Sequence, residues 1–119
     1  MSKTQTVNKQ IHTFSDAIST MAHASSDIAS AFEKLYTTTL NNGKFPQKFK
    51  ELIAITIAIA SASDESLRNH IRSGIESGLT REELIEGIGV VILMKGENAF
   101  IYSAKALTIY DSDKNSYKR

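Results

Sequence analysis

The segment from residue 47 to residue 62, QKFKELIAITIAIASA, constrains the fold most because it is apolar on nearly every side. Its isoleucines alternate with smaller residues, which is the period of a β-strand. We favour a helix because Pro46 is suited to a helix start, good helix formers follow it, and alanines recur along the segment.

A helix that is apolar all round has to be covered all round, and a chain of 119 residues has few other helices with which to cover it. We therefore expect further copies of the chain to cover part of this helix or of its neighbours, in a homo-oligomer. A monomer in which the other helices wrap a central helix is the alternative.

Apolar residues recur at intervals of three and four on both sides of this segment, which is typical of amphipathic helices. The clearest start signal is a capping box formed by Thr80 and Glu83. Gly87 and Gly89 lie inside the helix that follows, where we expect another helix to approach them closely. The expected helices span about 12–23, 26–41, 47–62, 65–77, 81–96 and 97–110.

These helices predict an all-α fold, a single-domain bundle of five to six helices over residues 11–110, with a flexible N-terminus at 1–10 and a flexible C-terminal tail at 111–119. The net charge of +1 gives no basic surface for nucleic acid. The apolar stretches are shorter than the ~20 residues that span a membrane. The N-terminus lacks the apolar region of a secretory signal. We expect a cytoplasmic protein with no nucleic-acid and no membrane partner.

Glu51 and His70 are the candidate catalytic residues. If the segments before and after residues 61–64 form an antiparallel hairpin, these two residues differ by only about 5–8 Å along its length. A carboxylate beside an imidazole would set the tautomer of the ring, which suits a general acid/base. The same pair could equally be a structural hydrogen bond.

Ser63 and Ser66 stand at the expected start of a helix. A capping role fits them, because a short side-chain oxygen can accept a backbone N–H there. The alternative is a weak anion site, since those N–H groups also favour a carboxylate or phosphate. His12 and His23 match no metal-ligand spacing and the chain has no cysteine, so we expect no metal and no cofactor.

An ordered set of motifs carries a resemblance to a known family: KEL, then NHIRSGIESG, then GLTREEL, then MKG. Over about residues 45–107 the sequence resembles the carboxymuconolactone decarboxylase/alkylhydroperoxidase D-like family. The thiol branch of that family has the pattern Glu-x11-Cys-x2-Cys-x3-His. This chain keeps the frame with Glu51 and His70, but Ser63 and Ser66 stand where the cysteines would be.

A serine cannot supply the thiolate or the disulfide that peroxide reduction needs, so the sequence argues against a thiol peroxidase. The decarboxylase branch implies removal of CO2 from a small carboxylated lactone or keto acid of aromatic catabolism. It implies that His70 gives or takes the proton, that Glu51 orients it, and that Ser63 and Ser66 lie near a substrate carboxylate. It also implies trimers or hexamers. The alternative is a non-catalytic oligomeric family member, a binding or structural protein.

Overall fold

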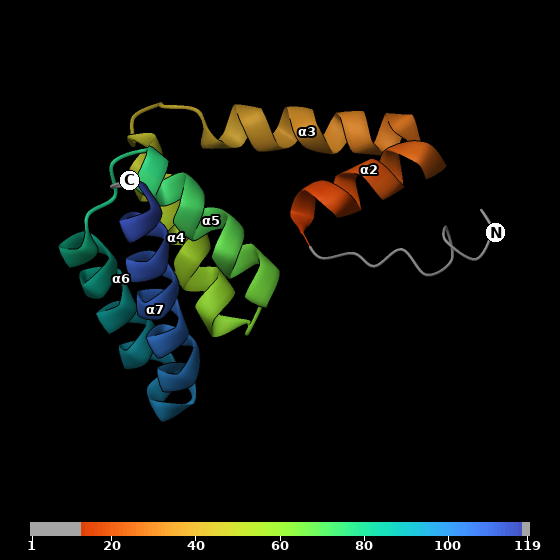
Figure 1. The fold of residues 1–119 in the computed structure, drawn as a ribbon. Coiled ribbons are helices and arrows are strands. Elements are labelled where there is room, and N and C mark those ends of the chain that lie inside the picture. Colours follow the sequence, from red (N-terminus) through yellow and green to blue (C-terminus); the bar gives the residue numbers. More distant parts are fainter. Residues whose placement is uncertain (1–12, 118–119) are drawn as a thin grey trace. The chain divides into compact units, whose positions relative to one another are not determined.

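The structure is a computed structural model that describes residues 13–117. Helices joined by short turns make up this range, and no strand occurs within it, which confirms the predicted all-α class (Figure 1). His12 and the N-terminus predicted to be flexible lie outside the described residues. The contacts divide the chain into a first compact unit that ends at Thr37 and a second that begins at Thr38.

The first unit contains α2, Phe14–Ala24, and most of α3, Ser26–Leu40. Both helices match the predicted ones at 12–23 and 26–41 to within two residues. Thr13 and Asp16 form a capping box at the start of α2. The two helices are joined by an aromatic cluster in which the ring centres of Phe14, Phe32 and Tyr36 lie 5.7–6.0 Å apart.

The second unit holds four helices packed side by side: α4 (Gln47–Ala60), α5 (Asp64–Glu76), α6 (Arg81–Lys95) and α7 (Phe100–Tyr117), with a 3-10 turn, η1 (Gly96–Ala99), before α7 (Figure 1). The ambiguous isoleucine-rich segment is therefore a helix, as predicted. No helix in the described part of the chain is long and apolar enough to cross a membrane. The core is built from Ile55, Ala58, Ile59, Leu67, Ile71, Ile75, Leu79, Leu84, Ile88, Val91, Ala99, Ala106 and Tyr110.

The same C-terminal capping motif ends α4 and α5, but with different residues. After α5, Gly78 takes a φ of 95° and the N–H groups of Gly78 and Leu79 donate to Ile75 O and Gly74 O. After α4, Ala62 takes a φ of 55° and the corresponding N–H groups donate to Ile59 O and Ala58 O. Glycine is the usual residue at this left-handed position, so Ala62 carries backbone strain that Gly78 avoids.

The start of α6 is the capping box that the sequence predicts, with Thr80 Oγ1 accepting from Glu83 N and Glu83 Oε1 accepting from Thr80 N. Gly87 meets α4 closely, since a Cβ there would lie 2.7 Å from Leu52 Cδ1. Gly89 has no such neighbour within 4 Å. The expected close approach is therefore present at Gly87 and absent at Gly89 among the described residues.

The last helix continues to Tyr117, beyond the predicted end at Tyr110 and into the region predicted to be a loose tail. A two-bond ion pair from Arg81 to Asp111 holds the turn after Tyr110. The buried Tyr110 hydroxyl donates to Leu79 O at 2.7 Å, which ties α7 to the α5–α6 turn. No glycine or proline occurs between residues 111 and 117, so no residue there interrupts the helix.

Candidate functional site

The α4–α5 hairpin brings the two candidate catalytic residues together. Its turn lies at residues 61–63, so the helices run antiparallel and Glu51 comes level with His70. Glu51 Oε1 lies 2.7 Å from His70 Nδ1, which is a short, charge-assisted hydrogen-bond distance. The hairpin geometry inferred from the sequence thus produces a direct contact between the two side chains.

The pair is enclosed on the carboxylate side and open on the imidazole side. The Glu51 side chain is 1% exposed and the His70 side chain 15% exposed. Gly74 lies beside Glu51, since a Cβ at Gly74 would lie 3.1 Å from Leu79 Cδ2 and 3.7 Å from Glu51 Cβ. The absence of a side chain at position 74 therefore lets Leu79 pack closely against α5, while the distance to Glu51 would be an ordinary van der Waals contact.

Gln47 is part of the site and was not predicted from the sequence. Gln47 Nε2 lies 3.3 Å from Glu51 Oε2, so both oxygens of this carboxylate have hydrogen-bond partners. The backbone N–H of Gln47 donates to Asn42 Oδ1 at 2.7 Å, which fixes the start of α4. The signal in the sequence was the spacing, since residues four apart on a helix share a face.

With Glu51 ionised, the hydrogen bonds around its carboxylate determine which group is the donor in the pair. An ionised carboxylate only accepts hydrogen bonds, and the Gln47 amide donates to one of its oxygens. The contact at the other oxygen then has His70 Nδ1 as the donor. Nε2 lies on the opposite side of the imidazole ring from Glu51.

Ser63 and Ser66 lie on the same helix as His70, at intervals of three and four residues, and so share its face. Ser63 is the N-cap residue of α5, but its hydroxyl makes no capping hydrogen bond and lies 3.1 Å from Ser61 Oγ. Ser66 is exposed in the first turns of the helix. Within the described residues, neither serine forms a hydrogen bond with Glu51 or His70.

The remaining histidine of the described range lies in the first unit. His23 Nδ1 is 2.9 Å from Ser19 O, one turn earlier in α2. Residues 13–117 contain no group of three or more His, Asp or Glu side chains placed to hold a metal ion. The described part of the chain therefore contains a hydrogen-bonded acid–imidazole pair and no metal-binding cluster.

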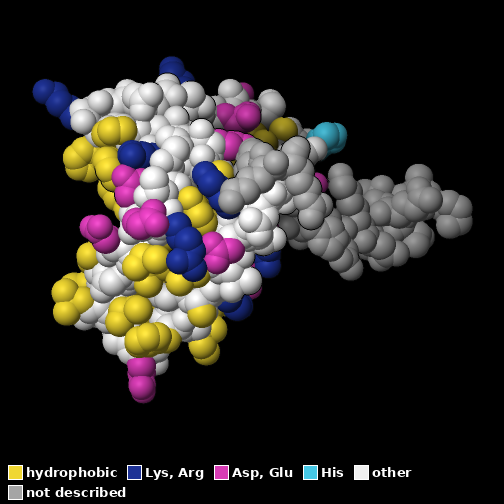
Figure 2. Space-filling view, turned by 60° about the vertical axis from the view of Figure 1, so that its left-hand side comes forward, with side chains coloured by type: hydrophobic (Ala, Val, Ile, Leu, Met, Phe, Trp, Pro, Cys, Tyr) yellow, Lys and Arg dark blue, Asp and Glu magenta, His cyan; other side chains and the backbone are white. Residues whose placement is uncertain are grey.

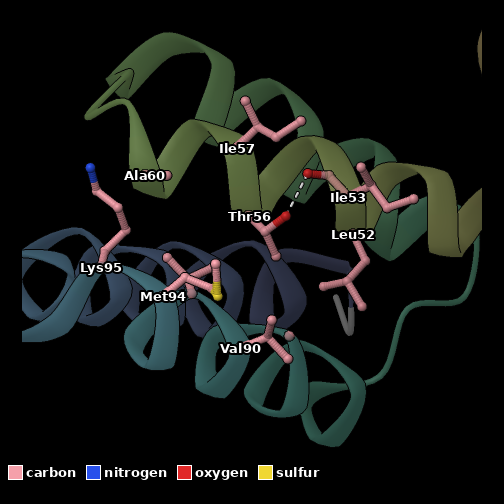
Figure 3. A pocket seen from close by; sticks show the side chains of 10 residues that line it. Leu52, Ile53, Thr56, Ile57, Ala60, Val90, Met94 and Lys95 are labelled. Atoms are coloured by element: carbon pink, nitrogen blue, oxygen red, sulfur yellow. Dashed lines mark hydrogen bonds between the residues drawn. The ribbon is translucent and has the colours of Figure 1, made fainter.

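A second feature is an apolar groove of about 420 Å³ between α4 and α6 (Figure 3). Leu52 and Thr56 of α4 point across it toward Val90 and Met94 of α6, and Lys95 lies at one end. The Thr56 hydroxyl donates to Ile53 O within its own helix, so it adds little polarity to the groove. Figure 2 shows hydrophobic side chains gathered at the protein surface among charged ones.

Comparison with solved structures finds the same fold in proteins of one family. A carboxymuconolactone decarboxylase family protein from Legionella pneumophila, in its apo form, superposes with a TM-score of 0.79 at 25% identity, over 83% of this chain and 88% of its own. A candidate carboxymuconolactone decarboxylase from Burkholderia xenovorans LB400 gives a TM-score of 0.77 at 28% identity, over 87% of this chain and 83% of its own.

Sequence relatives have no assigned activity. An uncharacterized protein of Cupriavidus necator is 31% identical over 83 residues, which is 70% of this chain and 74% of that protein. An uncharacterized protein from the cox locus of Paracoccus denitrificans is 27% identical over 97 residues, covering 82% of this chain and 87% of that protein. The model of the carboxymuconolactone decarboxylase family matches residues 26–108. The chain belongs to the carboxymuconolactone decarboxylase family.

Proposed function

We propose that this protein is an acid–base decarboxylase that acts on a small carboxylated lactone or keto acid. His70 is the catalytic residue of the proposal, and Glu51 positions it. The observation that carries the proposal is the 2.7 Å contact between a fully buried carboxylate and an imidazole that is still partly exposed. Membership of the family supports the reaction class, and the absence of cysteine argues against thiol chemistry.

In the proposed step, the bond between a ring carbon and the departing carboxylate of the substrate breaks. Carbon dioxide leaves, and the electron pair of that bond passes into the unsaturated lactone. Protonated His70 then delivers the Nε2 proton to the substrate carbon that lost CO2. A proton from water then re-protonates the imidazole ring of His70. The negative charge of the Glu51 carboxylate stabilises the positive charge of the protonated imidazole and keeps Nδ1 as the donor in the pair.

The N-terminus of α5 is the proposed place for a second carboxylate of the substrate. Ser63 and Ser66 lie there, one and two turns before His70 on the same face. Backbone N–H groups and the helix dipole both favour an anion at this end of a helix. In the proposal, an anion bound there would hold the reacting carbon toward the imidazole.

The direct test is an assay of the purified protein on γ-carboxymuconolactone, beside His70→Ala and Glu51→Gln. General acid–base groups contribute about 10²–10⁴-fold, so each variant is expected to lose activity on that scale. Equal activity in all three proteins would contradict the roles of Glu51 and His70. If all three are inactive, the alternative is favoured: a non-catalytic binding or structural member of the family in which the pair is a structural hydrogen bond.

We also propose that the protein is a homo-oligomer, a trimer or hexamer, in which further copies cover the α4–α6 groove. The groove is bordered by large exposed side chains, with Ile57 61%, Val90 60% and Met94 74% exposed. Exposed apolar surfaces of this kind mark interaction sites. Light scattering should show dissociation in Ile57→Glu and no change in Thr39→Glu, an exposed control. A monomeric wild-type protein would contradict this proposal.

The cytoplasmic location expected from the sequence stays a prediction.

A further inference from the structure

The Gln47 side chain contacts Glu51, the buried member of the pair, from one turn earlier in α4. Gln47 is the first residue of α4, where a wide range of side chains is tolerated and acidic ones are favoured by the helix dipole. Its side chain is instead partly buried and turned along the helix toward Glu51. The Nε2–Oε2 distance of 3.3 Å is at the long end of the hydrogen-bond range.

We propose that Gln47 is a positioning residue, which occupies one oxygen of Glu51 so that the other accepts from His70 Nδ1. This inference rests on the proposed function for its catalytic consequence, but the geometry it concerns exists without substrate. A carboxylate held at one oxygen only can rotate about its terminal bond, which is a soft torsion. A donor at Oε2 limits that rotation and keeps Oε1 directed at the imidazole.

The support for Gln47 comes from a continuous series of hydrogen bonds. Asn42 Oδ1 accepts from the backbone N–H of Gln47 and so fixes the first residue of α4. The Gln47 side chain then reaches one turn along the helix to Glu51, and Glu51 reaches across the seam to His70. Outer hydrogen bonds of this kind are known to orient the groups that act directly on a ligand.

Two substitutions separate a positioning role from a merely structural one. Gln47→Glu keeps the size of the side chain and suits the helix start, but it replaces the donor with an acceptor beside Glu51. Gln47→Lys changes the shape but keeps a donor. A structural role predicts that Gln47→Glu is the harmless change. A positioning role predicts that Gln47→Lys is the milder one.

The measurement is the ring ¹⁵N chemical shifts of His70 in the full chain, assigned by the signals that His70→Ala removes. The wild-type neutral ring should show the Nδ1–H tautomer. In Gln47→Glu, the population of the Nδ1–H tautomer of His70 should fall while the melting temperature stays unchanged. The kcat on the lactone should fall about tenfold. Gln47→Lys should keep wild-type ring signals. Thr39→Val, at an exposed position in α3 away from the groove and the pair, is the control and should leave both quantities unchanged.

Wild-type ring signals and kcat in Gln47→Glu would overturn the proposal. If the wild-type protein does not decarboxylate the lactone, the proposed function fails, but the tautomer measurement still decides the role of Gln47. If Gln47→Glu unfolds, Gln47→Lys gives the answer. Loss of the Nδ1–H tautomer in that folded variant would show that a donor at position 47 is not what matters.

Discussion

The two sides of α4 differ in how completely the chain covers them. Toward α5, the helix buries Glu51, Ile55, Ala58 and Ile59, and this is where the acid–imidazole pair lies. Toward α6, the same helix leaves an apolar groove with exposed isoleucines along its edge. The composition of the two sides is similar, so composition does not explain the difference.

The difference shows that the two sides of one apolar helix can have different environments in a small bundle. The side packed against α5 excludes water from a carboxylate, which strengthens its interaction with His70. The side facing α6 leaves part of its apolar surface exposed, and this is the surface that further copies would cover in the proposed oligomer. The same strand-like alternation of isoleucines supplies both sides, since every second residue of a helix points in a substantially different direction.

The largest expected effect is a difference in the free energy of unfolding between alanine variants of two isoleucines in α4. Ile55 is fully buried on the α5 side, whereas Ile57 is 61% exposed on the groove side. Ile55→Ala should lower the free energy of unfolding by about 2–5 kcal/mol because it removes core contacts and leaves a cavity. Ile57→Ala should change it by less than about 0.5 kcal/mol at low protein concentration. Urea unfolding of both variants checks this, and equal losses would contradict the two-sided account.

The next effect concerns the turns at the two ends of α5. Ala62 and Gly78 occupy the same position in the same capping motif, with φ angles of 55° and 95°. Ala62→Gly should stabilise the fold by about 1 kcal/mol, and Gly78→Ala should destabilise it by about as much. Thermal unfolding of the two variants gives the comparison. If Gly78→Ala stabilises the fold, the left-handed backbone conformation is not the reason that glycine is favoured at position 78.

A smaller effect is expected from replacing the two glycines inside α6. Gly89 has nothing within 4 Å of its missing Cβ, so Gly89→Ala should raise the free energy of unfolding by about 0.5–1 kcal/mol. Gly87→Ala should gain less, because Leu52 has to turn away from the new methyl group. Chemical denaturation at two protein concentrations is the measurement. A concentration-dependent loss in Gly89→Ala would show that another copy packs on that glycine.

The smallest expected effect is a pH dependence on the α6 side. The backbone N–H of Thr80, and then the ammonium of Lys48 at 2.9 Å, lower the pKa of Glu83 from its ordinary value of 4.5. A lowered pKa stabilises the fold fully above the unfolded-state value, and the stabilisation is lost as pH falls through the folded-state value. Glu83→Gln should therefore melt below wild type at pH 7, and the gap should close below pH 4.5. A gap that widens in acid would contradict this assignment.

Much of the fold could be predicted from local sequence signals. Apolar spacing and the Thr80–Glu83 capping box give the helices, and these depend on residues close in sequence. The contact between Glu51 and His70 could be predicted because a single short turn determines how two helices align. The fold class therefore followed from the sequence, and so did the centre of the candidate site.

Other features depend on tertiary contacts that no local signal encodes. Ala62 gives no hint of a left-handed residue, because alanine is normally the best helix former. The extension of α7 includes an ion pair of Asp111 with Arg81, which is far away in sequence. Gln47 was missed for a different reason: its spacing of four residues from Glu51 was a usable local signal, but a glutamine at a helix start is common and was not singled out.

Proton transfer through His70 is the central step of the proposed reaction, and chemical rescue tests it most directly. The His70→Ala variant should lose about 10²–10⁴-fold in decarboxylation of γ-carboxymuconolactone. Added imidazole should restore part of that rate, because a free ring can occupy the space beside the Glu51 carboxylate. An active wild-type protein whose His70→Ala variant is equally active, with no response to imidazole, would contradict the account.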